Sequence, residues 1–223
     1  PSGAGNDPLA RLLVGSLVPS RGAVRLDGAD IAAWDSVDRG PHVGYLPQGV
    51  ELFNGTVREN ICRFGVASDE HVLAAARVAG AHDLILGLPK GYDTPIGDGR
   101  WVLSGGQRQM IGLARAFFGC PPFIVLDEPN SNLDMAGDQA LTNAIRWAKE
   151  NKLSIALVTQ RPNLLVLADK IVVMRHGRME LLGPRDEVLA KMGWTPTPSA
   201  PQAQQVRGGP KPLASVQVGQ EHG

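Results

Sequence analysis

The 223-residue chain has few cysteines, no long apolar run and no excess of charge of either sign. Its two cysteines, Cys62 and Cys120, lack the spacing of metal ligands and no export signal opens the chain, so we interpret both as unpaired cytosolic thiols. The apolar runs fall short of the roughly 18 residues that a membrane-crossing helix needs, so any membrane part of the system is expected elsewhere. The 22 basic and 22 acidic residues cancel, which removes the general electrostatic case for a nucleic-acid partner.

With 43% hydrophobic residues, the chain can bury the core of one large domain, or of a domain with a subdomain. We assign this domain to residues 1–194. From Thr195 the composition changes to Pro, Gln, Gly and Ala with few large apolar residues. Residues 195–223 are therefore predicted to form a disordered tail, to which we assign no function.

Hydrophobic periodicity and turn residues predict that strands and helices alternate along this domain. Buried strands are expected at residues 42–46, 123–126 and 154–158, and helices at residues 9–14, 82–86, 139–150 and 185–192. Ser68 is expected to cap a further helix, and Pro8 to stand at the first position of the helix at 9–14. Hairpins are expected around Asp27-Gly28, with strands at 22–26 and 29–31, and around His176-Gly177, with strands at 170–174 and 178–182.

The segment from Leu103 to Asp134 contains the strongest candidate for a site. Four residues stand where a helix with apolar residues between positions 110 and 118 would begin: Ser104, Gly105, Gly106 and Gln107. A helix start presents unpaired N–H groups and a positive dipole end, so the pattern predicts an anion site. The alternative is an ordinary capped helix start.

A pair of carboxylates follows the apolar run at residues 123–126. This run suits a buried strand of a parallel sheet, and Asp127 and Glu128 stand at its carboxyl end, where open α/β sheets bind their ligands. Two adjacent carboxylates at that edge predict a site for magnesium and a water molecule. The alternative is a turn that ends the strand.

Three motifs of this segment, LSGGQ, FIVLDEP and SNLD, resemble the ATP-binding cassette (ABC) family. The resemblance implies an α/β fold of the P-loop NTPase type: a mainly parallel sheet flanked by helices, with a small antiparallel part and an inserted helical subdomain at about residues 62–118. It implies ATP and Mg²⁺ as cofactors, Asp127 as a magnesium ligand, Glu128 as the catalytic glutamate and Asp134 as the D-loop residue. It also implies that the signature residues 104–107 contact a nucleotide held by a second cassette.

The phosphate loop of this family is matched only in part. Against the pattern G-x-x-x-x-G-K-[ST], Gly5 is the final glycine and the first would precede Pro1, so the strand that feeds the loop is expected to be missing and the chain to be a fragment. The ATP-binding positions fall on Ser2, Gly3, Ala4, Gly5, Asn6 and Asp7. Asn6 replaces the phosphate-binding lysine, and Asp7 replaces the magnesium-binding hydroxyl, which leaves its carboxylate as an alternative metal ligand. The carboxylate of Asp7 would also repel the phosphates of ATP. Two like charges 4 Å apart cost about 4 kcal/mol at an effective dielectric of about 20, so ATP affinity is expected to fall.

Two glutamines take family positions further along the chain. Gln48 follows the strand predicted at 42–46 and resembles the Q-loop residue, which contacts magnesium through water and links the nucleotide to the membrane partner. Gln160 stands at the position of the switch histidine. A glutamine can donate a hydrogen bond but cannot carry positive charge. The resemblance therefore assigns catalysis to Glu128, Gln160 and Gln48, with the switch and phosphate-loop positions degenerate.

The stretch ELFNGTVRENI after Gln48 is similar to that of exporter-type cassettes, where it lies beneath the coupling helices of the permease. Together with PNSNLD and T-x-R-P-x-L-L, it resembles the ATPases of type I secretion, which move unfolded polypeptides out of Gram-negative bacteria. We therefore expect an ATPase at the cytoplasmic face of a bacterial inner membrane. Its expected partners are a second cassette and a transmembrane permease bound through the Q-loop region.

Two other functions remain open at this point. The chain could be a pseudo-ATPase that lends its signature helix to a competent partner, because its phosphate loop and switch position are degenerate while LSGGQ is intact. It could also be a soluble cassette in DNA or ribosome work. The balanced charge and the short interval between Gln48 and Ser104, which leaves no room for a long coiled coil, disfavour this last class.

Overall fold

The computed structural model describes residues 6–97 and 102–194, and of Asn6 and Asp7 only the backbone. The predictions for Ser2–Gly5 and for the tail at 195–223 lie outside the described residues. Among the described residues, no helix combines the length and the apolar character needed to cross a bilayer.

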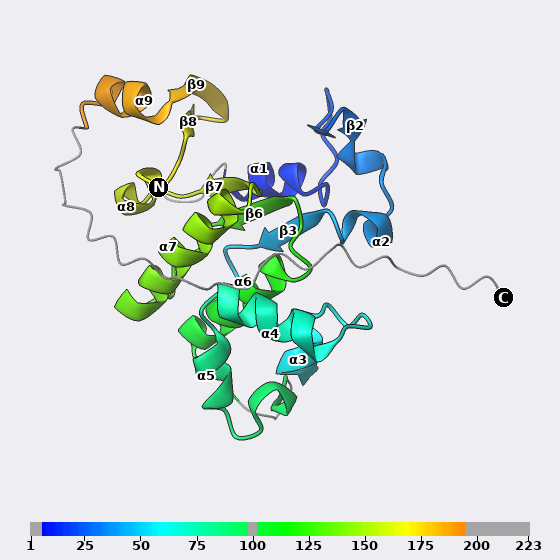
Figure 1. The fold of residues 1–223 in the computed structure, drawn as a ribbon. Coiled ribbons are helices and arrows are strands. Elements are labelled where there is room, and N and C mark those ends of the chain that lie inside the picture. The colour runs from blue at the N-terminus through cyan, green and yellow to red at the C-terminus, as the bar shows by residue number, and fades with distance from the viewer. Residues whose placement is uncertain (1–5, 98–101, 195–223) are drawn as a thin grey trace.

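A parallel sheet of three strands forms the centre of the fold (Figure 1). Its order is β3 (Val43–Leu46), β6 (Phe123–Asp127) and β7 (Ser154–Val158). The central strand β6 pairs with both neighbours, with Leu126 opposite Leu46 and Asp127 opposite Val158. Because the strands are parallel, their carboxyl ends meet at one edge of the sheet.

The side chains of β6 alternate between two hydrophobic clusters, one on each face of the sheet. Ile124 and Leu126 belong to the larger cluster, to which α6 (Gly105–Phe117) and α7 (Met135–Glu150) contribute. Val125 belongs to the smaller cluster, together with Ala10 of α1 (Asn6–Leu13). Alternation is the period of a strand, and coverage of both faces explains why the sequence of β6 is continuously apolar. The predicted α/β class, with helices flanking a parallel sheet, is confirmed.

A group of helices packs beside the sheet around α6. Its other members are α3 (Val57–Ile61), α4 (Asp69–Val78) and α5 (His82–Leu86). Both α3 and α4 pack against α6, with Ile61, Val72 and Ile111 buried in the shared cluster. α3 begins with a capping box, in which the Thr56 hydroxyl accepts from the N–H of Glu59 and the Glu59 carboxylate accepts from the N–H of Thr56.

Short antiparallel pairs lie outside the central sheet: β1 (Arg25–Leu26) with β2 (Ala29–Asp30), β4 (Gly55–Thr56) with β5 (Pro95–Ile96), and β8 (Lys170–Arg175) with β9 (Arg178–Pro184). The hairpins predicted around Asp27-Gly28 and His176-Gly177 are confirmed. Both residues of each turn have positive φ, as tight two-residue hairpins require. The remaining elements are η1 (Ile31–Ala33), α2 (Ser36–Arg39), η2 (Gly91–Asp93), α8 (Pro162–Leu165) and α9 (Arg185–Lys191).

Some element boundaries differ from the predictions. α1 begins at Asn6, so Pro8 lies within its first turn and not at its first position. α7 begins at Met135 because the carboxylate of Asp134 accepts from the N–H of Gly137 at 2.8 Å and caps the helix earlier than predicted. Ser68 precedes α4 as predicted but makes no capping hydrogen bond, since its hydroxyl pairs with His71 Nδ1 at 2.6 Å.

β7 is less buried than predicted. Ser154 is exposed and residues 155–158 are half-buried. Among the residues that the structure describes, β7 pairs with β6 along one edge alone, which leaves its other edge without a neighbouring strand. The first hairpin is also shorter than predicted, because Ile31 begins the 3-10 turn η1.

Gly44 of β3 lies too close to α6 to carry a side chain. A Cβ at this position would lie 2.1 Å from the carbonyl oxygen of Ala116. We expect Gly44→Ala to lower the free energy of unfolding by about 1–3 kcal/mol, because backbone must move to make room. Gly49→Ala is the control, since its Cβ would meet nothing within 4 Å. Denaturant unfolding of both variants measures the difference, and equal stabilities would contradict this close approach.

Candidate functional site

Asp127 and Glu128 lie at the carboxyl edge of the central sheet. Asp127 is the last residue of β6 and is 0% exposed. The N–H of Glu128 donates to the carbonyl of Val158 at the end of β7, at 2.8 Å. Glu128 has a φ of +44°, which is uncommon for a residue other than glycine. Its Oε1 atom is buried and has no hydrogen-bond partner among the described residues. The turn therefore holds a carboxylate oxygen to which no described residue donates a hydrogen bond.

The two predicted glutamines lie at the same edge. Gln48 follows the end of β3 by two residues, Gln160 follows the end of β7 by two residues, and both are exposed. Because β3, β6 and β7 are parallel neighbours, their following loops carry Gln48, Glu128 and Gln160 to one side of the sheet. In the described part of the chain, no side-chain hydrogen bond joins the three.

A magnesium ion is compatible with this edge. Mg²⁺ usually takes one or two protein carboxylates and completes its octahedron with waters and substrate phosphates. Asp127 would supply the carboxylate, and the buried Oε1 of Glu128, which no described residue hydrogen-bonds, suits an oxygen that faces a water. Within residues 6–97 and 102–194, three or more His, Cys, Asp or Glu side chains do not gather into a metal site. The edge thus fits an ion shared with a phosphate ligand.

The LSGGQ residues form the beginning of α6, as predicted. Ser104 is the N-cap residue: its hydroxyl accepts from the N–H of Gln107 at 3.1 Å, and the Gln107 side chain accepts from the N–H of Ser104 at 2.9 Å. This reciprocal capping box makes the helix start self-sufficient. A Cβ on Gly105 would lie 3.4 Å from the Asn132 side chain, and one on Gly106 would lie 3.1 Å from the Asn132 carbonyl oxygen. Gly106 therefore allows the loop after Glu128 to lie directly against the helix start, whereas a Cβ at Gly105 would make an ordinary contact.

A hydrogen bond that the sequence did not predict connects α6 to the turn that follows Glu128. Gln109 of α6 is 1% exposed, and its Nε2 donates to the carbonyl of Pro129 at 2.9 Å. Pro129 directly follows Glu128. A polar residue on the apolar face of the predicted helix was the signal that could have revealed this contact. Asp134, predicted as the D-loop residue, is exposed and caps α7.

Two positions of the predicted phosphate loop, Asn6 and Asp7, lie at the start of α1. Asn6 and Asp7 are its first two residues, and Ser2–Gly5 lie outside the described residues. Further along, Ala10 anchors the helix in the cluster that contains Val125 of β6. α1 therefore packs on the strand that carries Asp127.

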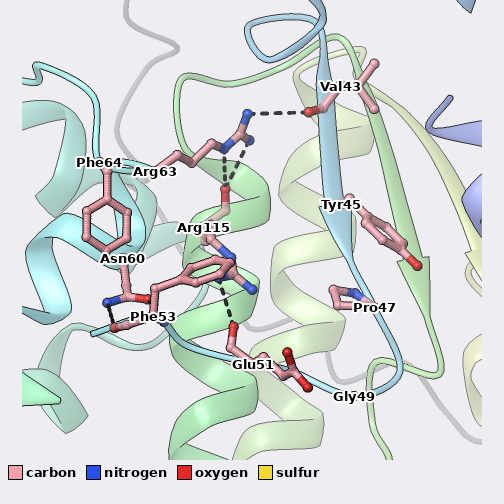
Figure 2. Close-up of a pocket in the computed structure, with 10 residues that line it drawn as sticks. All are labelled: Val43, Tyr45, Pro47, Gly49, Glu51, Phe53, Asn60, Arg63, Phe64 and Arg115. Atoms are coloured by element: carbon pink, nitrogen blue, oxygen red, sulfur yellow. Dashed lines mark hydrogen bonds between the residues drawn. The ribbon is translucent and has the colours of Figure 1, made fainter. Parts of the chain in front are cut away.

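A pocket of about 470 Å³ is lined by Pro47 and Gly49, the two neighbours of Gln48 in the sequence (Figure 2). It is lined by Val43, Tyr45, Pro47, Gly49, Glu51, Phe53, Asn60, Arg63, Phe64 and Arg115. Two of these residues are arginines, which the sequence analysis did not single out. Burial, and to a lesser degree the neighbouring charge of Arg115, lowers the pKa of Arg63 to about 10. Burial also lowers the pKa of Arg115. The pocket therefore has two neighbouring positive charges in its lining.

Known proteins resemble the chain in both sequence and structure. The ABC transporter family model matches residues 1–131. The chain is 51% identical over 193 residues to the type I secretion system ATP-binding protein PrsD of Rhizobium meliloti, an alignment that covers 86% of this chain and 33% of PrsD. It is 39% identical to the cyclolysin secretion/processing ATP-binding protein CyaB of Bordetella pertussis, over 86% of this chain and 27% of CyaB. A bacterial Atm1-family ABC exporter with ATP bound superposes with a TM-score of 0.76 and 34% identity, over 86% of this chain and 34% of that one. The chain thus spans about a third or less of the length of these relatives.

The capping box at Ser104 predicts a measurable contribution to stability. Ser104→Ala should lower the free energy of unfolding by about 1 kcal/mol, because the N–H of Gln107 loses its acceptor. Ser68→Ala is the matched control, since Ser68 occupies the N-cap of α4 without a capping hydrogen bond. Denaturant midpoints of the two variants should differ, and a loss at Ser68 as large as at Ser104 would argue against the capping role.

Proposed function

The chain belongs to the ABC transporter family, and we propose that it is an ATP-binding domain that powers an exporter of the type I protein secretion class. One observation carries the proposal: a buried aspartate and a catalytic-type glutamate end the central strand of a sheet whose neighbouring helix begins with an intact signature. The similarity to PrsD and CyaB supports the secretion class. The likeness to an ATP-bound exporter supports the transport role.

In this proposal each residue at the carboxyl edge has a separate task. Asp127 would hold Mg²⁺, with Gln48 reaching it through water, and a bound ion would supply positive charge to the phosphates. Glu128 accepts a proton from the attacking water, and its backbone hydrogen bond to Val158 keeps its turn in place. Gln160 donates a hydrogen bond from the loop after β7. The residues at positions 2–7 contact the phosphates of ATP.

The signature acts on a different nucleotide. Ser104, Gly105, Gly106 and Gln107 contact ATP held by a second cassette, where the hydroxyl, the bare backbone and the helix dipole favour a phosphate. The permease is proposed to bind at the pocket beside Gln48, since Glu51, Phe53 and Asn60 of the ELFNGTVRENI stretch line it. The assembly would lie at the cytoplasmic face of a bacterial inner membrane.

A second candidate function follows from the contrast between the altered phosphate-loop and switch positions and the complete signature. Asn6, Asp7 and Gln160 replace residues that act on phosphate charge, whereas the signature has its full capping box. A chain with an impaired nucleotide site of its own and an intact signature could still complete the site of a partner. In this alternative the chain is a pseudo-ATPase that donates its signature.

We expect the chain to hydrolyse ATP much more slowly than cassettes with intact motifs. Loss of one charge-stabilising donor typically costs about 10²- to 10³-fold in rate, and two such positions, Asn6 and Gln160, are changed here. Steady-state phosphate release by the purified chain measures this. Turnover close to that of an intact cassette would refute the impairment.

The matched gain-of-function variant combines Asn6→Lys, Asp7→Ser and Gln160→His. Grafted in place of the 193 matching residues of PrsD, it should support ATP hydrolysis and polypeptide export, with the preceding residues of PrsD completing the phosphate loop. The unrestored graft is the control. Equal export by both grafts, or hydrolysis without export by the restored one, would count against the proposed function.

The donated-signature alternative predicts an asymmetric dependence in a mixed dimer. Combined with a cassette that has the phosphate-loop lysine and the switch histidine, the chain should support one working site. Ser104→Arg in this chain should abolish that activity, because the long cation blocks the approach of phosphate to the helix start. Glu128→Gln in this chain is the control, since it alters the other site. The alternative fails if Glu128→Gln removes the activity of the mixed dimer while Ser104→Arg leaves it intact.

A further inference from the structure

Two backbone hydrogen bonds define the turn that follows β6. The N–H of Glu128 donates to the carbonyl of Val158 at 2.8 Å, and the carbonyl of Glu128 accepts from the N–H of Ser131 at 3.1 Å. The second bond joins the first and fourth residues of a β-turn, whose central residues are Pro129 and Asn130. These bonds fix where the turn begins and ends, but they are compatible with either orientation of the peptide group between the two central residues.

The orientation of this central peptide group separates the two common kinds of β-turn. Proline is favoured as the second residue in both kinds, whereas the third residue needs a negative φ in type I and a positive φ in type II. Type II is accessible to this turn, because asparagine is one of the few residues that tolerate positive φ. Asn130 nevertheless does not have a positive φ. The central peptide group is therefore outside the type II orientation.

Gln109 of α6 holds this peptide group from outside the turn. Its Nε2 donates at 2.9 Å to the carbonyl oxygen of Pro129, which is the oxygen of the central peptide group. A flip to type II would turn this oxygen away and break the bond. The side-chain amide of Asn130 is buried and has no hydrogen-bond partner among the described residues, so it does not take over this task.

Stability alone does not account for a glutamine at this position. The Gln109 side chain is 1% exposed, and its Oε1 is buried without a hydrogen-bond partner in the part of the chain that the structure describes. A buried polar atom without a partner costs free energy, whereas methionine has a similar shape and no such atom. What the amide adds over methionine is its one bond, to the turn of Glu128.

We infer that Gln109 is a positioning residue for Glu128, because it holds the turn in the form that directs this carboxylate to the attacking water. Glu128 is the first residue of the turn and has a φ of +44°, a conformation that few residues other than glycine adopt. A change in the turn would rotate this backbone and the carboxylate with it. A misplacement of about 1 Å can cost about 10²-fold in rate. The inference rests on the proposed function, because it takes Glu128 as the base.

The first test uses Gln109→Met in the full chain, which removes the donor and keeps the shape of the side chain. We expect the amide proton of Ser131, followed by NMR, to exchange with solvent about tenfold faster, because the turn opens more often without Gln109. The midpoint of denaturant unfolding should not fall, since the partnerless Oε1 is lost together with the bond. Unchanged exchange at Ser131 would overturn the inference. Loss of cooperative unfolding would overturn it too, because Gln109 would then be required for folding itself.

Asn151→Leu is the matched control. Nδ2 of Asn151 donates to the carbonyl of Trp147 at 2.8 Å, at the opposite end of α7 from Asp134. It is therefore also a side-chain amide bonded to a backbone oxygen, and leucine keeps its shape. We expect this change to leave the exchange of Ser131 unaltered. Equally fast exchange in both variants would indicate a general loosening of the fold and would contradict a specific role of Gln109.

The second test measures turnover in the PrsD graft with restored phosphate-loop and switch positions. Gln109→Met in this graft should lower kcat for ATP hydrolysis about tenfold and leave KM for ATP unchanged, since a positioning residue acts on the reaction and not on nucleotide binding. An unchanged kcat, with or without a raised KM, would refute the positioning role. If the graft that retains Gln109 hydrolyses no ATP, the proposed function fails, and the exchange of Ser131 alone then decides whether Gln109 holds the turn.

Discussion

The burial of β6 on both faces is the constraint on which the rest of the molecule depends. Ile124 and Leu126 fill one hydrophobic cluster and Val125 fills the other, so the strand cannot shift in register without exposing apolar surface on both sides. Asp127 continues the same strand and is carried into the interior by it. A buried carboxylate is costly on its own, so the apolar strand supplies the packing energy that keeps it at the sheet edge.

The functional groups are arranged around the two ends of one segment. The signature opens α6, the acidic pair closes β6, and the segment between them makes the central contact of the helical group with the sheet. In the proposed two-cassette assembly these ends serve different nucleotides. In that assembly, a change at one end of the segment would affect one nucleotide and leave the contact with the other nucleotide unaltered.

The sequence predicted the parts of the fold that depend on local chemistry. The apolar run before Asp127 and the glycine turns at Gly28 and Gly177 were read correctly, because strand burial and positive φ each leave a direct mark on residue type. Ser68 occupies the predicted N-cap position of α4 but makes no capping hydrogen bond, because its hydroxyl pairs with His71, a competing neighbour that pattern rules do not weigh. The burial of β7 was overestimated, because it depends on which strands lie beside β7 in space. The residues of β7 alone do not indicate those neighbours.

In the candidate site, too, some features could be predicted from the sequence and others depended on the three-dimensional fold. Placement of Gln48, Asp127 and Glu128 at one edge follows from parallel strand order, which motif spacing predicts. The pocket arginines were missed because Arg63 and Arg115 are 52 positions apart and meet only through the fold. Their residue type gave no hint, since most arginines lie on solvated surfaces and only the three-dimensional contacts reveal that this pair bonds to carbonyls.

The hydrogen bond from Gln109 to Pro129 connects the two candidate sites of the chain, the signature at the start of α6 and the acidic turn after β6. The Gln109 side chain of α6 donates to the carbonyl of Pro129, the residue after Glu128. A displacement of the start of α6 would therefore be transmitted to the acidic turn of the same chain. In the proposed two-cassette assembly, this single amide group would therefore couple the signature, which faces one nucleotide, to the acidic turn, which faces the other.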